Sequence, residues 1–508
     1  MMDVLSAFLL ILTIIPAVSY GWGMRGTTIG GEKGAMLPGA IIGLVIAMFN
    51  GVLIVREHFY IFAALGAVSM YFGGSMTYGE TLGISMNSRP AENMKKGLIA
   101  LFIKGFLWFG CFGVIFTTGI NAVCYVYSLK ELLIILGVTP LSAVGLYFIF
   151  NKPLKPAEDK FPKIYFSKKR QESWGALLGA FLTLFIFAII KSNFFTIVFS
   201  LSCALFGGLG WVLGQLLQIY SIHYADSSKS YFGRLLGKSN NVDSWKIMEC
   251  VLGAFGGLGA AIGFISTYDI FKKTVFTLEK NGGLLPFNET FSKIAFIVWL
   301  VLIVLDLIHY FIKKPQTKTQ LKTKLKTKEI TQEQYSAQLL KAVDSVPKCY
   351  DIYYKITEII EPVLYAALPF ILICLGCEKA SVTVSFFLLF FVLCQEIALE
   401  KVITPKSSLV LKIILGIACA TLLILQLTFE SIFNENVTLI LYTVIYEVLT
   451  LGWLVPQLIL NSSENGDKEV IFKNKIVNWY NIVRNSKSFL KVHGYFIICI
   501  ALTLIILL

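Results

Sequence analysis

Apolar runs of about 20 residues recur along the whole chain, and each is long enough to cross a bilayer as an α-helix. Because no water inside a bilayer can hydrogen-bond a free peptide group, such runs must form helices or a closed β-barrel. The two-residue alternation of barrel strands does not occur here. With 56% hydrophobic and only 15% charged residues among 508, the sequence predicts an all-α fold, namely a polytopic integral membrane helical bundle.

We expect about fourteen transmembrane helices from these runs. Their expected bounds are 4–20, 34–55, 59–84, 97–118, 131–150, 173–191, 195–221, 246–266, 292–312, 359–376, 381–399, 408–432, 436–460 and 489–508.

The charges of the chain indicate its topology. The net charge of +13 comes from Lys and Arg residues that concentrate between the apolar runs, on one side of the predicted helices. By the positive-inside rule that side is cytoplasmic, which places the amino terminus outside a bacterial-type inner membrane or a plasma membrane. Basicity here therefore predicts topology and contact with membrane lipid, and nucleic acid is not an expected partner.

The glycines divide the chain, because 36 of the 41 precede residue 300. Residues 1–312 are expected to form a glycine-rich transmembrane core, in which helix backbones approach closely or break within the membrane. A basic cytoplasmic loop is expected at 313–358, followed by a carboxy-terminal bundle of Leu, Ile and Phe-rich helices at 359–508. That bundle includes an amphipathic, interfacial segment at about 468–488.

The core also contains a predicted parallel repeat, about 34–118 and 173–266. Gly34-Ala-Met-Leu-Pro-Gly-Ala40 resembles Gly175-Ala-Leu-Leu-Gly-Ala180, and Phe72-Gly73-Gly74 resembles Phe206-Gly207-Gly208. Four spans separate the two copies, so they have the same orientation in the membrane. The alternative is that glycine-rich helices resemble one another by chance.

The stretch from Tyr20 to Gly39, "YGWGMRGTTIGGEKGAMLPG", combines glycines and charges between two apolar runs. It contains GxGxxG, but no β-strand precedes it, so the dinucleotide-binding interpretation is rejected. It does offer anion-binding groups: flexible backbone N–H groups, the start of a helix, and four side chains. These predicted substrate-binding side chains are Arg25, Thr27, Thr28 and Lys33. A short cytoplasmic turn whose charges only set topology is the alternative.

Other polar residues lie inside the predicted spans at the same, cytoplasmic end. Gln215 and Gln218 join the predicted substrate-binding residues, and Glu32, Glu80 and Lys104 are candidates for coupling to a proton or cation. Ionisable groups inside a membrane are costly and tend to face a cavity or a partner. Lys104 is at a depth that allows pairing with Glu80. Lys104 and Glu249 have an equally plausible role as structural pairs near helix ends.

Several chemistries have no support in the sequence. The four histidines are dispersed, so no metal site is predicted, and no cofactor is expected. GxSxG and HExxH are absent, and no catalytic residue is assigned.

Three functions fit these features. The first is a secondary transporter of a small anionic substrate, coupled to a proton or cation. The second is a membrane-embedded enzyme that acts on a lipid-linked phosphate or glycan, with Glu80 as general base. The third is a structural or assembly subunit whose glycines only pack helices. The sequence favours transport and does not specify the substrate or the oligomeric state.

Overall fold

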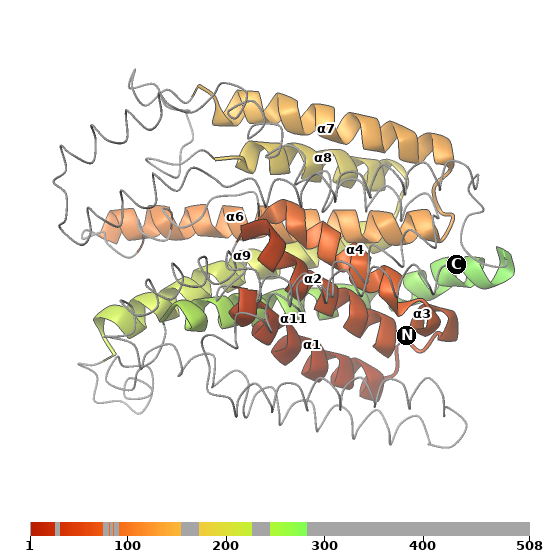
Figure 1. Ribbon diagram of the computed structural model, residues 1–508, viewed down its shortest axis with the longest axis horizontal. Coiled ribbons are helices and arrows are strands. Elements are labelled where there is room, and N and C mark those ends of the chain that lie inside the picture. Colours follow the sequence, from red (N-terminus) through yellow and green to blue (C-terminus); the bar gives the residue numbers. More distant parts are fainter. Residues whose placement is uncertain are drawn as a thin grey trace, which may run out of the picture. The chain divides into compact units, whose positions relative to one another are not determined.

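The computed structural model describes residues 2–25, 31–74, 81, 85, 91–153, 172–225 and 244–281, and within these ranges the chain is α-helical without any β-strand. The helices, shown in Figure 1, are α1 (Val4–Arg25), α2 (Gly31–Phe49), α3 (Leu53–Glu57), α4 (Phe59–Gly73), α6 (Ala91–Val123), α7 (Leu129–Asn151), α8 (Trp174–Ile190), α9 (Phe194–His223) and α11 (Ser244–Asn281). Five of them are long and apolar enough to cross a membrane: α1, α6, α7, α9 and α11. The helical prediction is confirmed for this part of the chain.

Each of the first eight predicted spans overlaps a described helix, but α4 ends at Gly73 rather than at 84, and α2, α4 and α8 are not among the membrane-length helices. The later predicted spans, the basic loop 313–358 and the interfacial segment lie outside the described residues. One predicted span, 34–55, is interrupted, since α2 ends at Phe49 and the short α3 begins at Leu53. Asn50 ends the helix: its side-chain amide donates to the Ile46 carbonyl at 3.2 Å and accepts from the Val52 N–H at 2.8 Å. Gly51 then adopts a φ of +71°, which glycine allows without strain.

Short side-chain caps fix the starts of helices at the end opposite the charged connections. Ser128 and Glu131 form a capping box at α7, in which Glu131 Oε2 accepts from the Ser128 N–H at 2.8 Å. Asn193 Oδ1 accepts from the Thr196 N–H at 3.0 Å and caps α9. These caps explain how connections of only a few residues reverse the chain between neighbouring helices.

Glycines bring α2 and α4 into backbone contact. A Cβ on Gly39 would lie 2.2 Å from the Gly66 carbonyl oxygen, and a Cβ on Gly43 would lie 2.0 Å from that of Phe62. No side chain fits at either position without separating the helices. The expected close approach of glycine-rich helices is confirmed for this pair.

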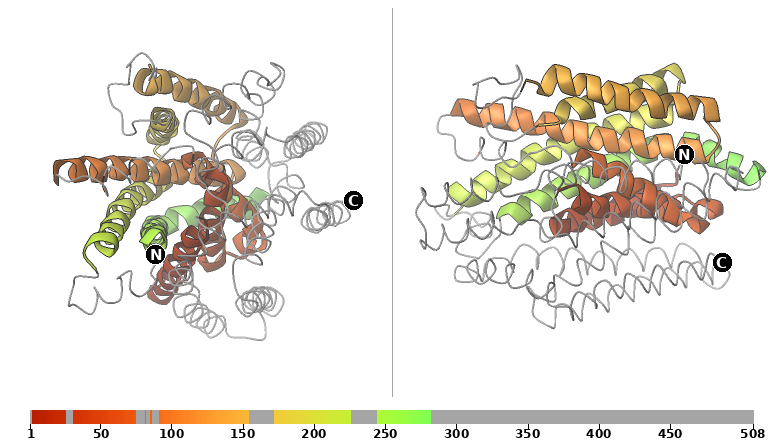
Figure 2. Two further views of the ribbon diagram at one scale, coloured as in Figure 1. Left: turned by 60° about the vertical axis from the view of Figure 1, so that its left-hand side comes forward. Right: turned by 45° about the horizontal axis from the view of Figure 1, so that its top comes forward.

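α9 packs between α6 and α11, and the three helices lie side by side in Figures 1 and 2. Its Gly207 faces Phe109 of α6, where an added Cβ would lie 2.5 Å from the ring. Its Gly214 faces α11, where an added Cβ would lie 2.7 Å from the Met248 carbonyl oxygen. Glycines on two faces of α9 therefore allow it to contact both neighbours closely.

The glycines aligned in the predicted repeat contact different neighbours. Gly39 packs against Gly66 of α4, the next apolar helix, whereas the aligned Gly179 packs against Ser142 of α7, the preceding helix. Gly73 and Gly207 are more alike, because both pack against α6, at Trp108 and Phe109. The repeat stays a prediction.

Candidate functional site: a buried polar end of the bundle

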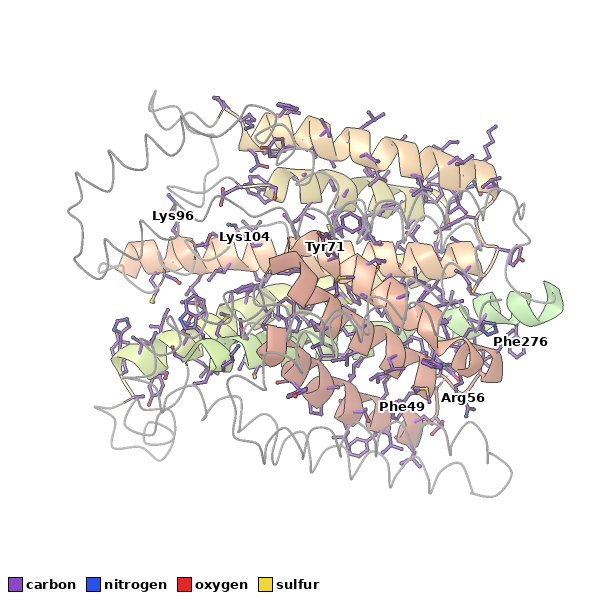
Figure 3. All side chains as sticks on the ribbon, in the orientation of Figure 1. Phe49, Arg56, Tyr71, Lys96, Lys104 and Phe276 are labelled. Carbon is purple, nitrogen blue, oxygen red and sulfur yellow. The ribbon has the colours of Figure 1, made fainter. Side chains whose placement is uncertain are left out.

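One end of the described bundle brings together the carboxyl ends of α1 and α9 and the amino ends of α6, α8 and α11. Lys246, near the start of α11, donates to the carbonyl of Gly23 in the last turn of α1 at 2.8 Å. Lys104 of α6 contacts Glu172, just before α8. Figure 3 shows Lys104 on the half of α6 that also carries Lys96, away from Arg56 and Phe49. We call this region the polar end.

Lys104 forms the first ion pair of the polar end. Its ammonium lies 2.8 Å from Glu172 Oε1 and donates to Thr81 Oγ1 at 2.9 Å. The two charged side chains are only 1% and 2% exposed. Lys104 thus connects α6 to Thr81, the residue that follows Glu80 in the sequence. It also connects α6 to Glu172, just before the start of α8. The attraction between the two charges offsets part of the cost of removing them from solvent.

The sequence did not single out Glu172, because it lies outside every predicted span and at the end of a basic connection. The predicted pairing of Lys104 with Glu80 stays a prediction, since Glu80 lies outside the described residues. A lysine within an apolar span indicated that Lys104 either pairs with a carboxylate or reaches a helix end. Only the packing of α6 beside the start of α8 identifies Glu172 as a partner.

Lys246 and Glu249 form the second ion pair, at 2.8 Å within the first turns of α11. Both side chains are buried, with exposures of 6% and 7%. The Gly23 carbonyl that Lys246 also contacts lies in the last turn of α1, where carbonyls lack an intrahelical donor and carry partial negative charge. Lys246 therefore caps the end of α1 within the predicted anion-binding stretch. Glu249 is thus paired near a helix end, which is one of the roles that the sequence left open for it.

Three tryptophans, Trp22 of α1, Trp108 of α6 and Trp211 of α9, are fully buried and pack against one another. The ring centroids of Trp22 and Trp108 are 5.2 Å apart with edge-to-face geometry, and those of Trp108 and Trp211 are 6.4 Å apart. Trp108 Nε1 donates to the Met70 carbonyl at 3.0 Å, which links this cluster to α4. Rigid aromatic packing of this kind fixes the relative positions of α1, α4, α6 and α9.

Gln215 and Gln218 lie on α9 one and two turns beyond Trp211, and both are 0% exposed. Within the part of the chain that the structure describes, neither the amide nitrogen nor the amide oxygen of either side chain has a hydrogen-bond partner. A buried, unsatisfied amide is unfavourable, and native proteins contain few of them. In these two predicted substrate-binding residues, every polar side-chain atom is therefore buried and unsatisfied among the described residues.

The remaining predicted residues are only partly described. Arg25 is the last residue of α1, and Glu32 and Lys33 lie in the first turn of α2, which begins at Gly31. The positions of their side chains, and of Thr27 and Thr28, lie outside the described residues. The structure thus places the helix termini of the predicted anion-binding stretch and leaves its side-chain contacts as predictions.

The opposite end of the bundle has a different polar character. Lys191 and Glu131 form an ion pair there, but their side chains are 38% and 26% exposed. Nearby, Tyr127 accepts from Asn193 Nδ2 at 3.1 Å, and burial raises the pKa of the Tyr127 hydroxyl to about 12. Accessible pairs of this kind are ordinary surface features, in contrast to the enclosed pairs of the polar end.

Among the described residues, no group of three or more His, Cys, Asp or Glu side chains is placed to hold a metal ion. No protein-family model matches the chain, and neither a curated protein nor a solved structure is significantly similar to it. The fold of the described part is that of a multi-pass helical membrane protein.

Proposed function

We propose that the protein is a secondary transporter of a small anionic molecule, coupled to a proton or cation, with its substrate site at the polar end. The observation that carries this proposal is the ion pair of Lys104 and Glu172, which is almost completely buried within a bundle of membrane-spanning length. Charges in such positions are costly and typically belong to substrate or ion pathways.

The groups around the α1–α2 connection favour the binding of an anionic substrate. Arg25, Glu32 and Lys33 together carry a net charge of +1, and α2 begins at Gly31 with its partially positive amino end. Thr27 and Thr28 add hydroxyl donors between the two helices. Lys246 binds the carboxyl end of α1 beside this connection, so substrate binding there can influence the contact between α1 and α11.

The proposed coupling depends on the groups that surround the buried ammonium of Lys104. Lys104 contacts Glu172 and Thr81, and Glu80 is adjacent to Thr81 in the sequence. If Glu80 or Glu32 takes up a proton, the balance of charges around the buried ammonium changes, and the helices that it connects can rearrange. Alternating access in known transporter folds uses such rearrangements around a fixed site.

The test is flux through the purified full-length chain reconstituted in liposomes. Uptake of phosphate, dicarboxylates and sugar phosphates is measured with and without an imposed pH gradient. We expect at least one anion to be transported, and Lys104→Met to reduce its flux at least tenfold, while Lys104→Arg retains part of it. Glu172→Gln provides a second variant if Lys104→Met does not fold.

Lys191→Met is the matched control, because it removes a lysine from an exposed ion pair at the other end of the bundle. It should transport at the wild-type rate. The proposal fails if no anion is transported under any gradient, or if correctly folded Lys104→Met is fully active. Turnover of a lipid-linked phosphate without flux would instead favour the enzyme hypothesis.

A further inference from the structure

A continuous face of α9 carries Gly207, Trp211, Gln215 and Gln218, which recur at three- and four-residue spacing. The first half of this face packs against α6: an added Cβ on Gly207 would meet Phe109, and Trp211 lies against Gly105. The same face therefore presents the two glutamines one and two turns further along, at the polar end.

The two glutamines leave a large hydrogen-bonding capacity unused. Each carboxamide offers two N–H donors and a carbonyl oxygen with two lone pairs. Both side chains are 0% exposed, and no partner for them exists among the residues that the structure describes. An apolar side chain of similar size would avoid this cost. A buried polar group without a partner calls for a bound water or a ligand as its explanation.

Among the described residues, the charged side chains of the helix segments packed against α9 at the glutamines form ion pairs. Trp211 packs on Gly105, whose neighbour Lys104 is paired with Glu172. On the other side, Gly214 packs on Met248, which lies between the paired Lys246 and Glu249. Within the described residues, a ligand group beside the glutamines therefore meets the neutral amides themselves and paired charges. Such a site favours an uncharged group that both donates and accepts, as a hydroxyl does.

We infer that Gln215 and Gln218 bind the hydroxyl groups of a polyhydroxylated anion, such as a sugar phosphate or a sugar acid, whose charged group lies elsewhere in the polar end. This inference rests on the proposed function and specifies its substrate class. The same chemistry occurs in the glycerol headgroup of phosphatidylglycerol, so a free solute and a lipid headgroup are two sources of one ligand type. Sites built to hydrogen-bond a hydroxyl discriminate strongly against analogues that lack it, because buried amides are then left unpaired.

Binding to the full-length chain in nanodiscs tests the inference. Glucose 6-phosphate, glycerol 3-phosphate and inorganic phosphate are compared by calorimetry in phosphatidylcholine nanodiscs, and again with phosphatidylglycerol added. We expect glucose 6-phosphate to bind at least tenfold more tightly than inorganic phosphate. Competition by phosphatidylglycerol would identify the lipid headgroup as the source of the hydroxyls, and its absence would identify the free solute.

The variant Gln215→Leu/Gln218→Leu should abolish the preference for hydroxylated anions while leaving weak binding of inorganic phosphate unchanged. Because it replaces unpartnered amides, it should fold at least as stably as the wild type. Gln215→Met/Gln218→Met is the alternative if the leucine variant does not fold. Ser200→Ala is the control on the same helix, since the Ser200 hydroxyl already donates to the Thr196 carbonyl at 2.6 Å. It should keep the preference.

Three results would overturn the inference. Equal affinities of the wild type for hydroxylated and simple anions would do so, as would a preference that persists in the double variant. An experimental map showing each amide bonded only to water, with and without glucose 6-phosphate, would mean that the glutamines are merely hydrated. In each case anion flux in liposomes can still be intact, so failure here is distinct from failure of the proposed function.

Discussion

Removing the ammonium of Lys104 should destabilise the protein far more than removing a lysine from an exposed ion pair. In Lys104→Met the carboxylate of Glu172, 2% exposed, would lose its ion pair with Lys104, and Thr81 would lose the Lys104 donor. Leaving one charge of a buried pair uncompensated costs about 3–5 kcal/mol. This corresponds to a decrease of roughly two to four powers of ten in the folding equilibrium constant.

Reversible unfolding in mixed micelles, followed by tryptophan fluorescence, measures this cost as a change in the free energy of unfolding. The double variant Lys104→Met/Glu172→Met should recover most of the loss, because replacing both charges with apolar side chains is often neutral or better. Lys191→Met should have little effect, since its pair is exposed. A loss of less than about 1 kcal/mol in Lys104→Met, the range of surface pairs, would show that the Lys104–Glu172 pair does not behave as a buried pair.

Two further predictions concern packing and pH. Gly43→Leu should separate α2 from α4, because even a Cβ would lie 2.0 Å from the Phe62 carbonyl oxygen; we expect at least about 2 kcal/mol of destabilisation in the same unfolding assay. Gly137→Ala is its control, because an added Cβ there meets nothing within 4 Å. This change should be neutral or slightly stabilising. An equal loss of stability in both variants would contradict the packing argument. Burial raises the pKa of Tyr127 to about 12, so its neutral form is favoured in the folded state, and its contribution to stability should be complete below about pH 10 and decline as the pH rises toward 12. Thermal unfolding from pH 9 to 12 should show this decline in the wild type and a smaller one in Tyr127→Phe; identical pH profiles would show that the hydroxyl does not ionise as described.

The positions of the described helices were largely predictable from local chemistry. A run of apolar residues in lipid has to satisfy its own backbone hydrogen bonds, so the first eight spans could be located without any knowledge of their neighbours. The interruption after Phe49 was missed because it depends on one side chain, Asn50, bonding to the adjacent backbone. That glycines would permit close helix contacts was also predictable, but which helix each glycine faces was not.

The polar end was predictable only in part. Lys104, Gln215 and Gln218 could be singled out, because polar groups within apolar spans are costly and tend to face a cavity or a partner. Glu172 could not be singled out, since it lies two residues before α8 and its sequence position is that of an ordinary acidic loop residue. Its pairing with Lys104 depends on the packing of α6 beside the start of α8.

Hydropathy and backbone hydrogen bonding act within a single segment, so the sequence alone was enough to predict apolar helices with a charged end, five of which are long enough to cross a membrane. The tertiary structure decided which groups meet at that end. Lys104 and Glu172 are 68 residues apart, and Lys246 and Gly23 are 223 residues apart. Contacts over such separations are set by the packing of glycine and tryptophan surfaces between helices. The same packing leaves Gln215 and Gln218 buried without protein partners among the described residues.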